Sequence, residues 1–183
     1  MEPCRHFHFC PRCGQPRAAG ELVSPFRCVA CGFTLFFSAA NATATFIHRA
    51  DGRVLFIRRA RDPGQGRLAP PGGFVDPGER AEDAARREIR EEVGLEITPP
   101  EFLGSFTNRY AYLDVTYPVL DLFFTAHALD PNAARSLDDV ASLSWLDPLR
   151  EVAPDEMAFP SMQAALALLQ ARLRASAVVP ALT

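Results

Sequence analysis

Glutamates crowd one short stretch of the chain, residues 88–95, which reads Glu-Ile-Arg-Glu-Glu-Val-Gly-Leu. On a helix at about 100° per residue, Glu88 and Glu92 fall within the apolar stripe that faces a protein core, and Glu91 lies at its edge. Carboxylates turned toward a core repel one another and lose hydration unless a cation lies among them. Their hard oxygens suit magnesium or manganese, and magnesium shares its remaining positions with waters and substrate phosphates. The glutamates are therefore predicted ligands of a catalytic cation.

A helix over residues 80–93 must position these carboxylates. A Pro-Gly pair at 77–78 breaks the chain before it, and no further Gly or Pro occurs until Gly94, which suits a helix end with positive φ. The Pro/Gly-rich loop 62–73 leads into this segment. Its final Gly-Gly pair lets the backbone come close to the carboxylates, because neither residue has a side chain.

The segment 73–95 resembles, at every required position, the signature of the Nudix hydrolases, G-x5-E-x7-R-E-U-x-E-E-x-G-U, in which U is bulky and aliphatic. The residues that match are Gly73, Glu79, Arg87, Glu88, Ile89, Glu91, Glu92, Gly94 and Leu95. A chance match in a chain of this length is below about one in a million.

The resemblance implies an α/β fold, an α/β/α sandwich around a mixed sheet. It also implies hydrolysis of a nucleoside diphosphate linked to another group X, which gives a nucleoside monophosphate and X-phosphate. The residues that it places in the catalytic site are Glu79, Arg87, Glu88, Glu91 and Glu92, with Arg87 holding the glutamates in register. The ligands that it implies for Mg²⁺ or Mn²⁺ are Gly73, through its carbonyl, and Glu88, Glu91 and Glu92.

The residue that takes the proton from the attacking water stays open. Members of the family use either a glutamate within the signature, which corresponds to Glu88, or a carboxylate on a later loop. Asp138 and Asp139 are the candidates for the second arrangement, since they precede an expected strand. A solvated turn explains the two aspartates equally well.

Two Cys-x-x-Cys-Gly motifs precede the signature, and their cysteines are Cys10, Cys13, Cys28 and Cys31. Four thiolates from two tight turns give zinc a tetrahedral shell, so the spacing predicts a small β-rich zinc ribbon. Paired disulfides are the alternative, but the first residues contain no apolar signal region, so an oxidising compartment is not indicated. Cys4 is left over, and a ligand set that uses Cys4, His6 or His8 remains open, although these residues are interpreted as bystanders.

A zinc ribbon before the catalytic domain resembles the NADH pyrophosphatase branch of the Nudix family. That branch carries Ser-Gln-Pro-Trp-Pro-Phe-Pro-x-Ser after the signature, whereas residues 108–118 read Asn-Arg-Tyr-Ala-Tyr-Leu-Asp-Val-Thr-Tyr-Pro. NADH specificity is therefore not indicated. The residues that bind the substrate and the identity of its base stay unassigned.

Composition sets the expected organisation. The 183 residues, 48% of them hydrophobic with a net charge of −3, can form one core and a small metal-stabilised module. We expect a zinc ribbon over 1–37, a Nudix domain over 38–175 and a loose tail over 176–183. Strands are predicted at 41–47 and 54–58 around an Asp-Gly turn, then at 102–112, 119–127 and 141–146. Ser161 is predicted to cap a final helix.

The predicted partner is a small-molecule nucleotide diphosphate derivative, and the predicted location is cytoplasmic. No charge-free stretch reaches about 18 apolar residues, so no membrane partner is expected. Nucleic acid is not favoured, because the ribbon between Cys10 and Cys31 has three arginines against one glutamate. A homodimer is left open.

Two other functions are weighed against the pyrophosphohydrolase. One is an enzyme that removes the 5′ cap of RNA and uses the ribbon to contact nucleic acid. The other is a non-catalytic nucleotide sensor. Sensors built on this fold usually lose glutamates of the signature, and this chain has lost none.

Overall fold

The computed structural model describes residues 2–17 and 24–178 and divides into two compact units. Unit 1 consists of Met1–Ala40 and Arg109–Val119, and unit 2 consists of Asn41–Asn108 and Leu120–Thr183. In the described ranges, no helix is both long and apolar enough to cross a membrane.

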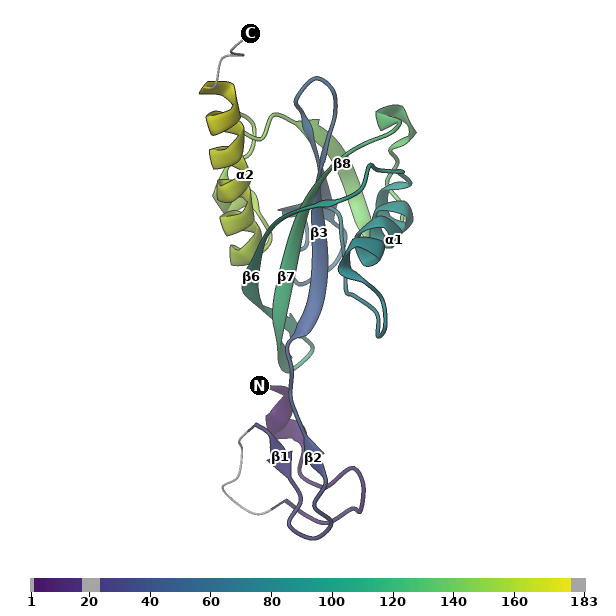
Figure 1. Ribbon diagram of the computed structural model, residues 1–183, viewed down its shortest axis with the longest axis vertical. Helices are drawn as coiled ribbons and strands as arrows, with labels where there is room; N and C mark the ends of the chain where they lie inside the picture. Colours follow the sequence, from purple (N-terminus) through teal and green to yellow (C-terminus); the bar gives the residue numbers. More distant parts are fainter. Residues whose placement is uncertain (1, 18–23, 179–183) are drawn as a thin grey trace. The chain divides into compact units, whose positions relative to one another are not determined.

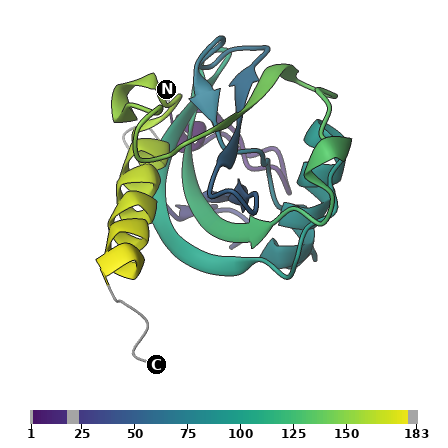
Figure 2. The same ribbon diagram turned by 90° about the horizontal axis from the view of Figure 1, so that it is seen from above.

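A six-stranded mixed sheet forms the centre of the larger unit, with the strand order β5-β4-β3-β7-β6 and with β8 paired to β4. The strands are β3 (Ala40–His48), β4 (Val54–Arg59), β5 (Leu68–Ala69), β6 (Glu101–Tyr112), β7 (Val115–His127) and β8 (Val140–Leu146). Helices α1 (Ala81–Val93) and α2 (Pro160–Val178) cover opposite faces of the sheet (Figures 1 and 2). The predicted α/β/α sandwich is confirmed.

The core lies between the sheet and the two helices. Phe46 is fully buried in β3, where its ring meets Phe56 edge-on with centroids 6.1 Å apart and stacks on Phe123 at 6.2 Å. On α1, the buried positions are Ala84, Ala85, Ile89 and Val93. The apolar stripe read from the sequence is therefore the face by which α1 packs, and the glutamates that share this stripe are held close to the sheet.

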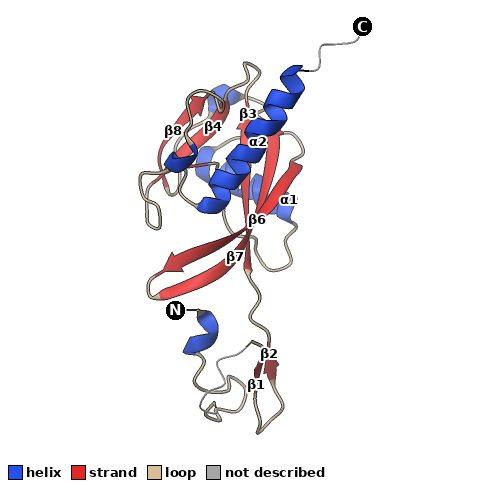
Figure 3. Ribbon diagram, turned by 90° about the vertical axis from the view of Figure 1, so that its left-hand side faces the viewer, coloured by secondary structure: helices blue, strands red, loops and turns tan. Residues whose placement is uncertain are grey.

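The last helix differs from its prediction at the first turn. Ser161 does not cap α2, which begins at Pro160; its hydroxyl instead donates a 2.5 Å hydrogen bond to the buried carboxylate of Asp121 in β7. A serine before an apolar run resembles a cap in the sequence, but here a distant buried acceptor binds the hydroxyl. Figure 3 shows α2 from the side on which it covers the sheet. The helix runs to Val178, and residues 179–183 of the expected tail lie outside the described residues.

Unit 1 contains a two-stranded antiparallel sheet of β1 (Phe26–Arg27) and β2 (Thr34–Leu35), in which Phe26 pairs with Leu35. Its small core consists of Cys10, Phe26 and Cys28, with Cys31, Phe33, Leu35 and Phe37 packed against them. A short 3-10 helix, η1 (Pro3–His6), precedes the first cysteine turn. Thiols make up much of so small a core, so its packing depends on what the cysteines bind.

Candidate functional site

Arg87 is the centre of the acidic cluster on α1. Its Nε and Nη2 donate to the carboxylate of Glu79 at 3.0 and 2.9 Å, and its Nη1 donates to Glu88 at 2.7 Å and to Glu91 at 3.2 Å. Nη2 also donates to the backbone carbonyl of Phe74 at 3.0 Å. One guanidinium thus connects the segment before the helix, two helix glutamates and the loop, which fixes their mutual positions.

The two glycines before the signature lie against the remaining carboxylates. The N–H of Gly72 donates to Glu92 at 2.8 Å. A Cβ on Gly73 would lie 2.5 Å from the carboxyl carbon of Glu88, and a Cβ on Gly72 would overlap the carbonyl of Thr43. The carbonyl of Gly73 accepts from the N–H of Thr43 at 2.8 Å, which ties the loop to β3. Only glycine permits this approach.

Gly94 ends the helix as soon as the glutamates are placed. Its φ of 67° is left-handed, and its N–H donates to the carbonyl of Arg90 at 3.1 Å. Such a residue satisfies a carbonyl of the last turn and redirects the chain, a conformation that glycine adopts without strain.

The cluster carries more negative charge than one arginine neutralises. Burial raises the pKa of Glu92 to about 8; the Gly72 N–H opposes this effect, and the nearby charge of Glu88 adds to it. Burial also raises the pKa of Glu88 against the effect of Arg87, whereas hydrogen bonds from Arg87 lower the pKa of Glu79. Buried carboxylates that resist ionisation favour a cation as a further partner.

The helix glutamates do not converge on a single point in this structure. The carboxylates of Glu88 and Glu91 both accept hydrogen bonds from Nη1 of Arg87, while the carboxylate of Glu92 accepts one from the N–H of Gly72. Within residues 2–17 and 24–178, the only group of three or more metal-ligating side chains whose donor atoms meet is the set of four cysteines. A cation at the glutamates would therefore have to draw Glu88 or Glu91 away from Arg87.

The charge of Asp139, one of the two loop aspartates, adds slightly to the raised pKa of Glu92. Its carboxylate forms a 3.0 Å ion pair with Arg61, and its carbonyl accepts from the N–H of Ala60 at 2.9 Å. The backbone of Asp139 is left-handed, with φ 56°. Two residues that directly follow β4, Ala60 and Arg61, thus fix the position of Asp139.

Other contributors to the site have no signature in the sequence. Arg59 donates from Nε to the carbonyl of Pro63 at 2.8 Å, and Arg58 donates from Nη1 to the carbonyl of Gly66 at 2.9 Å, so both arginines shape the Pro/Gly-rich loop. The N–H of Gly72 and the carbonyl of Phe74 are backbone groups, and a sequence pattern does not show where a backbone group points. The Gly-Gly pair was the only available signal.

The four cysteines of unit 1 form the second candidate site. The sulfurs of Cys10, Cys13, Cys28 and Cys31 all lie within 4.8 Å of one another, with Cys10 to Cys31 at 3.8 Å and Cys13 to Cys28 at 3.6 Å. Zinc–sulfur bonds of about 2.3 Å in a tetrahedron separate the sulfurs by about 3.8 Å. These distances far exceed the length of a disulfide bond, about 2.05 Å. The cluster could therefore hold zinc.

Both turns of the cluster have the same local geometry. Gly14 and Gly32 are left-handed, with φ 73° and 70°, and each donates its N–H to the carbonyl of the first cysteine of its motif at 2.9 Å. Hydrogen bonding by the backbone of Cys31 lowers the pKa of the Cys28 thiol to about 7, which favours the thiolate that zinc binds. A backbone hydrogen bond with Gln15 acts in the same direction on Cys13, but burial and the neighbouring thiols outweigh it and raise the pKa of Cys13 to about 12, so Cys13 is a thiol before a metal binds. Cys4, His6 and His8 contribute no donor atom to this group.

Comparison with known proteins identifies the family to which this sandwich, with its glutamate helix and glycine loop, belongs. The chain belongs to the NUDIX domain family, which matches residues 39–168. Among solved structures, a MutT NUDIX hydrolase from Burkholderia pseudomallei superposes with a TM-score of 0.62 at 28% identity and covers 72% of this chain and 98% of its own. A NUDIX hydrolase from Nitrosomonas europaea covers 100% and 97% with a TM-score of 0.68; at 19% identity it shows the fold alone.

The curated relatives are named as a hydrolase of NAD-capped RNA and as an ADP-ribose pyrophosphatase. The chain is 35% identical over 102 residues to the NAD-capped RNA hydrolase NudC of Stutzerimonas stutzeri, a match that covers 53% of this chain and 34% of the relative. It is 32% identical over 128 residues to the protein of that name from Deinococcus radiodurans, covering 61% and 45%. It is 38% identical over 76 residues to an ADP-ribose pyrophosphatase of Methanocaldococcus jannaschii, covering 42% and 44%. The chain thus spans less than half the length of each of these relatives.

Gly73→Ala should lower kcat/KM by about a hundredfold with little loss of folded protein. The added methyl would displace the Glu88 carboxylate, which lies 2.5 Å from the Cβ position, and a misplacement of about 1 Å at a catalytic group can have this effect. Gly104→Ala is the matched control, because its Cβ would meet the flexible end of Leu168 at 3.0 Å and the ring of Phe106 at an ordinary 3.6 Å. Steady-state kinetics and circular dichroism of both variants test the contact, and full activity in Gly73→Ala would show that it is dispensable.

Proposed function

We propose that the chain is a metal-dependent pyrophosphohydrolase. It cleaves the diphosphate of a nucleoside diphosphate linked to another moiety X and releases a nucleoside monophosphate and X-phosphate. The observation that carries this proposal is that Arg87 binds three of the four signature glutamates, Glu79, Glu88 and Glu91, through its side-chain nitrogens. The names of the relatives, NAD-capped RNA hydrolase and ADP-ribose pyrophosphatase, support the same chemistry.

Mg²⁺ or Mn²⁺ fits the donors that this site offers. Glu88, Glu91, Glu92 and the carbonyl of Gly73 are hard oxygen ligands, and burial raises the pKa values of Glu88 and Glu92, an effect that a bound cation would oppose. When bound, the cation supplies neutralisation of the diphosphate and acidification of a water. We propose these residues as its ligands, with zinc at the four cysteines as a separate, structural metal.

The residues of the chain then divide the remaining tasks. Arg87, tied to Glu79 and to Phe74, keeps the helix and the glycine loop at a fixed separation, so that carboxylates and backbone face the same phosphates. The proton of the attacking water goes either to Glu88, made more basic by burial, or to Asp139, which Arg61 holds. Comparing Glu88→Gln with Asp139→Asn decides between them, because only loss of the base removes the acidic limb of the pH profile of kcat/KM.

The identity of X is a matter for a substrate screen. NAD, ADP-ribose, dinucleoside polyphosphates and NAD-capped RNA should be offered with Mg²⁺ and Mn²⁺, and the release of nucleoside monophosphate measured. RNA belongs in this screen because several relatives are named for NAD-capped RNA. A non-catalytic sensor is not supported, since every acidic residue of the signature is present.

For any good substrate, water should attack phosphorus within the diphosphate and never the sugar carbon. The three helix glutamates project from one side of a single helix, where cations stabilise charge on phosphate oxygens. Attack at the sugar needs two carboxylates that flank the ring. Hydrolysis in ¹⁸O water, with both products weighed by mass spectrometry, should place the label on a phosphate. Label on ribose, or release of a free base, would show that the site has been misassigned.

A further inference from the structure

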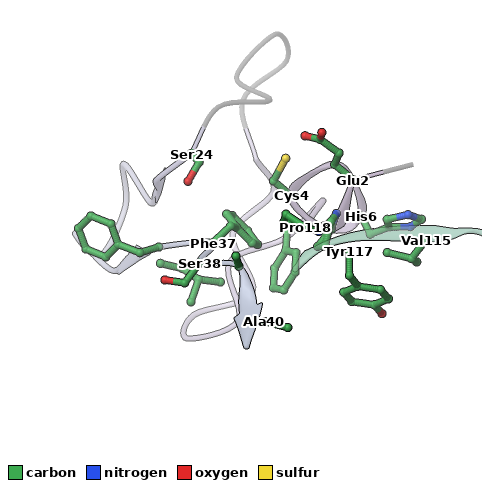
Figure 4. Close-up of a pocket in the computed structure, with 15 residues that line it drawn as sticks. Glu2, Cys4, His6, Ser24, Phe37, Ser38, Ala40, Val115, Tyr117 and Pro118 are labelled. Carbon is green, nitrogen blue, oxygen red and sulfur yellow. The ribbon is translucent and has the colours of Figure 1, made fainter. Parts of the chain in front are cut away.

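Unit 1 contains a pocket that the proposed chemistry does not use. It has a volume of about 600 Å³, within the range of about 300–1,000 Å³ typical of small-molecule sites. Its walls come from η1, from the segment that follows β2, and from the start of β7 (Figure 4). Both cysteine motifs lie outside the residues that line it, so the pocket is distinct from the zinc site.

Three phenylalanine rings and one tyrosine ring line this pocket. Phe37 is held by an edge-on contact with Phe7, with ring centroids 5.0 Å apart. Phe36 and Tyr117 also line the pocket and leave 69% and 37% of their surface exposed. Neither belongs to the core around the cysteines. The exposed rings of Phe36 and Tyr117, together with the fixed ring of Phe37, offer faces on which a flat ligand can stack.

The polar groups of the pocket suit a neutral ring and not a phosphate. Its described lining includes Glu2, His6, Ser38 and the tyrosine Tyr117, and no lysine or arginine. Glu2 is oriented by Arg109, whose Nη1 lies 3.4 Å from its carboxylate. A carboxylate accepts hydrogen bonds from ring or exocyclic N–H groups but repels phosphate. These lining groups fit an uncharged, flat, nitrogen-bearing heterocycle.

We propose that this pocket binds a nucleobase. This inference rests on the proposed function in one respect: a nucleotide substrate contains a base that the pocket could bind. That base has two sources, the moiety X of a small dinucleotide or a nucleotide of an RNA chain. Both present the same stacking face and the same N–H edge.

Adenosine is the probe, since it has the base but no phosphate for the glutamate site to bind. Isothermal titration of the zinc-loaded full chain should show that adenosine binds and ribose does not. Phe36→Ala and Tyr117→Ala should each weaken adenosine binding by about fivefold to a hundredfold, the range for loss of one base-stacking ring. Phe9→Ala is the matched control, because Phe9 is an exposed phenylalanine of the same unit, at 61%, outside the pocket.

Absence of adenosine binding, or equal weakening by Phe9→Ala, would overturn the proposal. Zinc content and circular dichroism verify that each variant is folded. The two sources separate in turnover: loss of kcat/KM in Tyr117→Ala on free dinucleotide assigns the base to X, and loss confined to NAD-capped RNA assigns it to the RNA. No loss on either substrate would refute a role for the pocket in substrate binding. A chain that binds adenosine but hydrolyses nothing would refute the proposed function and leave the pocket standing.

Discussion

Glu92→Gln should abolish most turnover and leave the protein folded. We expect kcat/KM to fall by about a hundredfold or more, the scale on which charged groups at a reacting centre act. Glutamine keeps the acceptor for the Gly72 N–H, which donates at 2.8 Å, but removes the charge that would hold the cation. The Glu91→Gln protein should lose a similar share of its activity, since Glu91 is also on α1 and its carboxylate accepts a hydrogen bond from Arg87. Substrate hydrolysis with saturating Mg²⁺ measures both losses.

The same substitution should stabilise the metal-free protein in a pH-dependent way. The pKa of Glu92 is about 8 in the folded state, above about 4.3 in an unfolded chain. The folded state therefore binds more protons between these values, and the stability contributed by Glu92 is lost as pH rises through that window. The advantage of Glu92→Gln should grow from pH 4.5 to pH 8 and reach on the order of 5 kcal/mol in the free energy of unfolding, since each unit of pKa difference corresponds to about 1.4 kcal/mol.

Glu82→Gln is the control for both effects. Glu82 lies in the first turn of the same helix, its carboxylate pairs with Arg80 at 3.5 Å, and its side chain is 41% exposed. Its loss should change neither activity nor the pH dependence of stability. Urea unfolding at several pH values, with magnesium omitted, gives the comparison. A Glu92→Gln protein that unfolds would mean that the carboxylate is a structural group.

One zinc ion per chain should copurify with the protein, and Cys28→Ser should remove it and unfold unit 1. Structural zinc in comparable modules contributes about 10–16 kcal/mol of apparent free energy. The core of unit 1 consists of Cys10, Phe26 and Cys28, so loss of the metal removes its main support. Four thiolates close the coordination shell and leave no position for water, so hydrolysis itself should not require zinc. Elemental analysis and limited proteolysis measure the two effects.

Cys4→Ser separates a zinc effect from the general loss of a thiol. Cys4 contributes no sulfur to the cluster, so this variant should retain the full zinc content and the protease resistance of unit 1. Purification must be carried out under reducing conditions, since oxidised thiols do not bind zinc. Absence of zinc from the wild-type protein in such a preparation would contradict the prediction.

The parts of the fold that the sequence predicts are those that depend on local signals. Apolar spacing and Gly94 place α1 within one residue of its observed start and at its observed end. The Asp51-Gly52 turn similarly places the β3–β4 hairpin. The two-residue strand β5 was not predicted, because it is defined by its pairing with β4 and by the bridge from Leu68 to Met157, and not by a local pattern. Asp121 accepting from Ser161, across 40 positions, is equally invisible to a local pattern.

The candidate site divides in the same manner. The signature residues and the cysteines are recognisable because their chemistry is carried by side chains at fixed spacing. The coupling of Asp139 to Glu92, the N–H of Gly72 and the pocket of unit 1 each bring together residues that are distant in the chain or backbone groups. The pocket is lined by both Glu2 and Tyr117. These residues are too far apart in the sequence for a motif with fixed spacing to predict that they lie together.

Arg87 has a consequence for how the acidic cluster takes up an ion. Its guanidinium already forms ion pairs with Glu79, Glu88 and Glu91. A divalent ion that binds these carboxylates therefore has to compete with Arg87 for them. The free energy of ion binding would then be the difference between two attractions, so we expect a modest affinity for the ion when no substrate is bound. Phosphate oxygens that arrive with the substrate add ligands on the side of the ion. Occupancy should therefore follow the presence of substrate, so that the hydrolytic ion is retained only while there is something to hydrolyse.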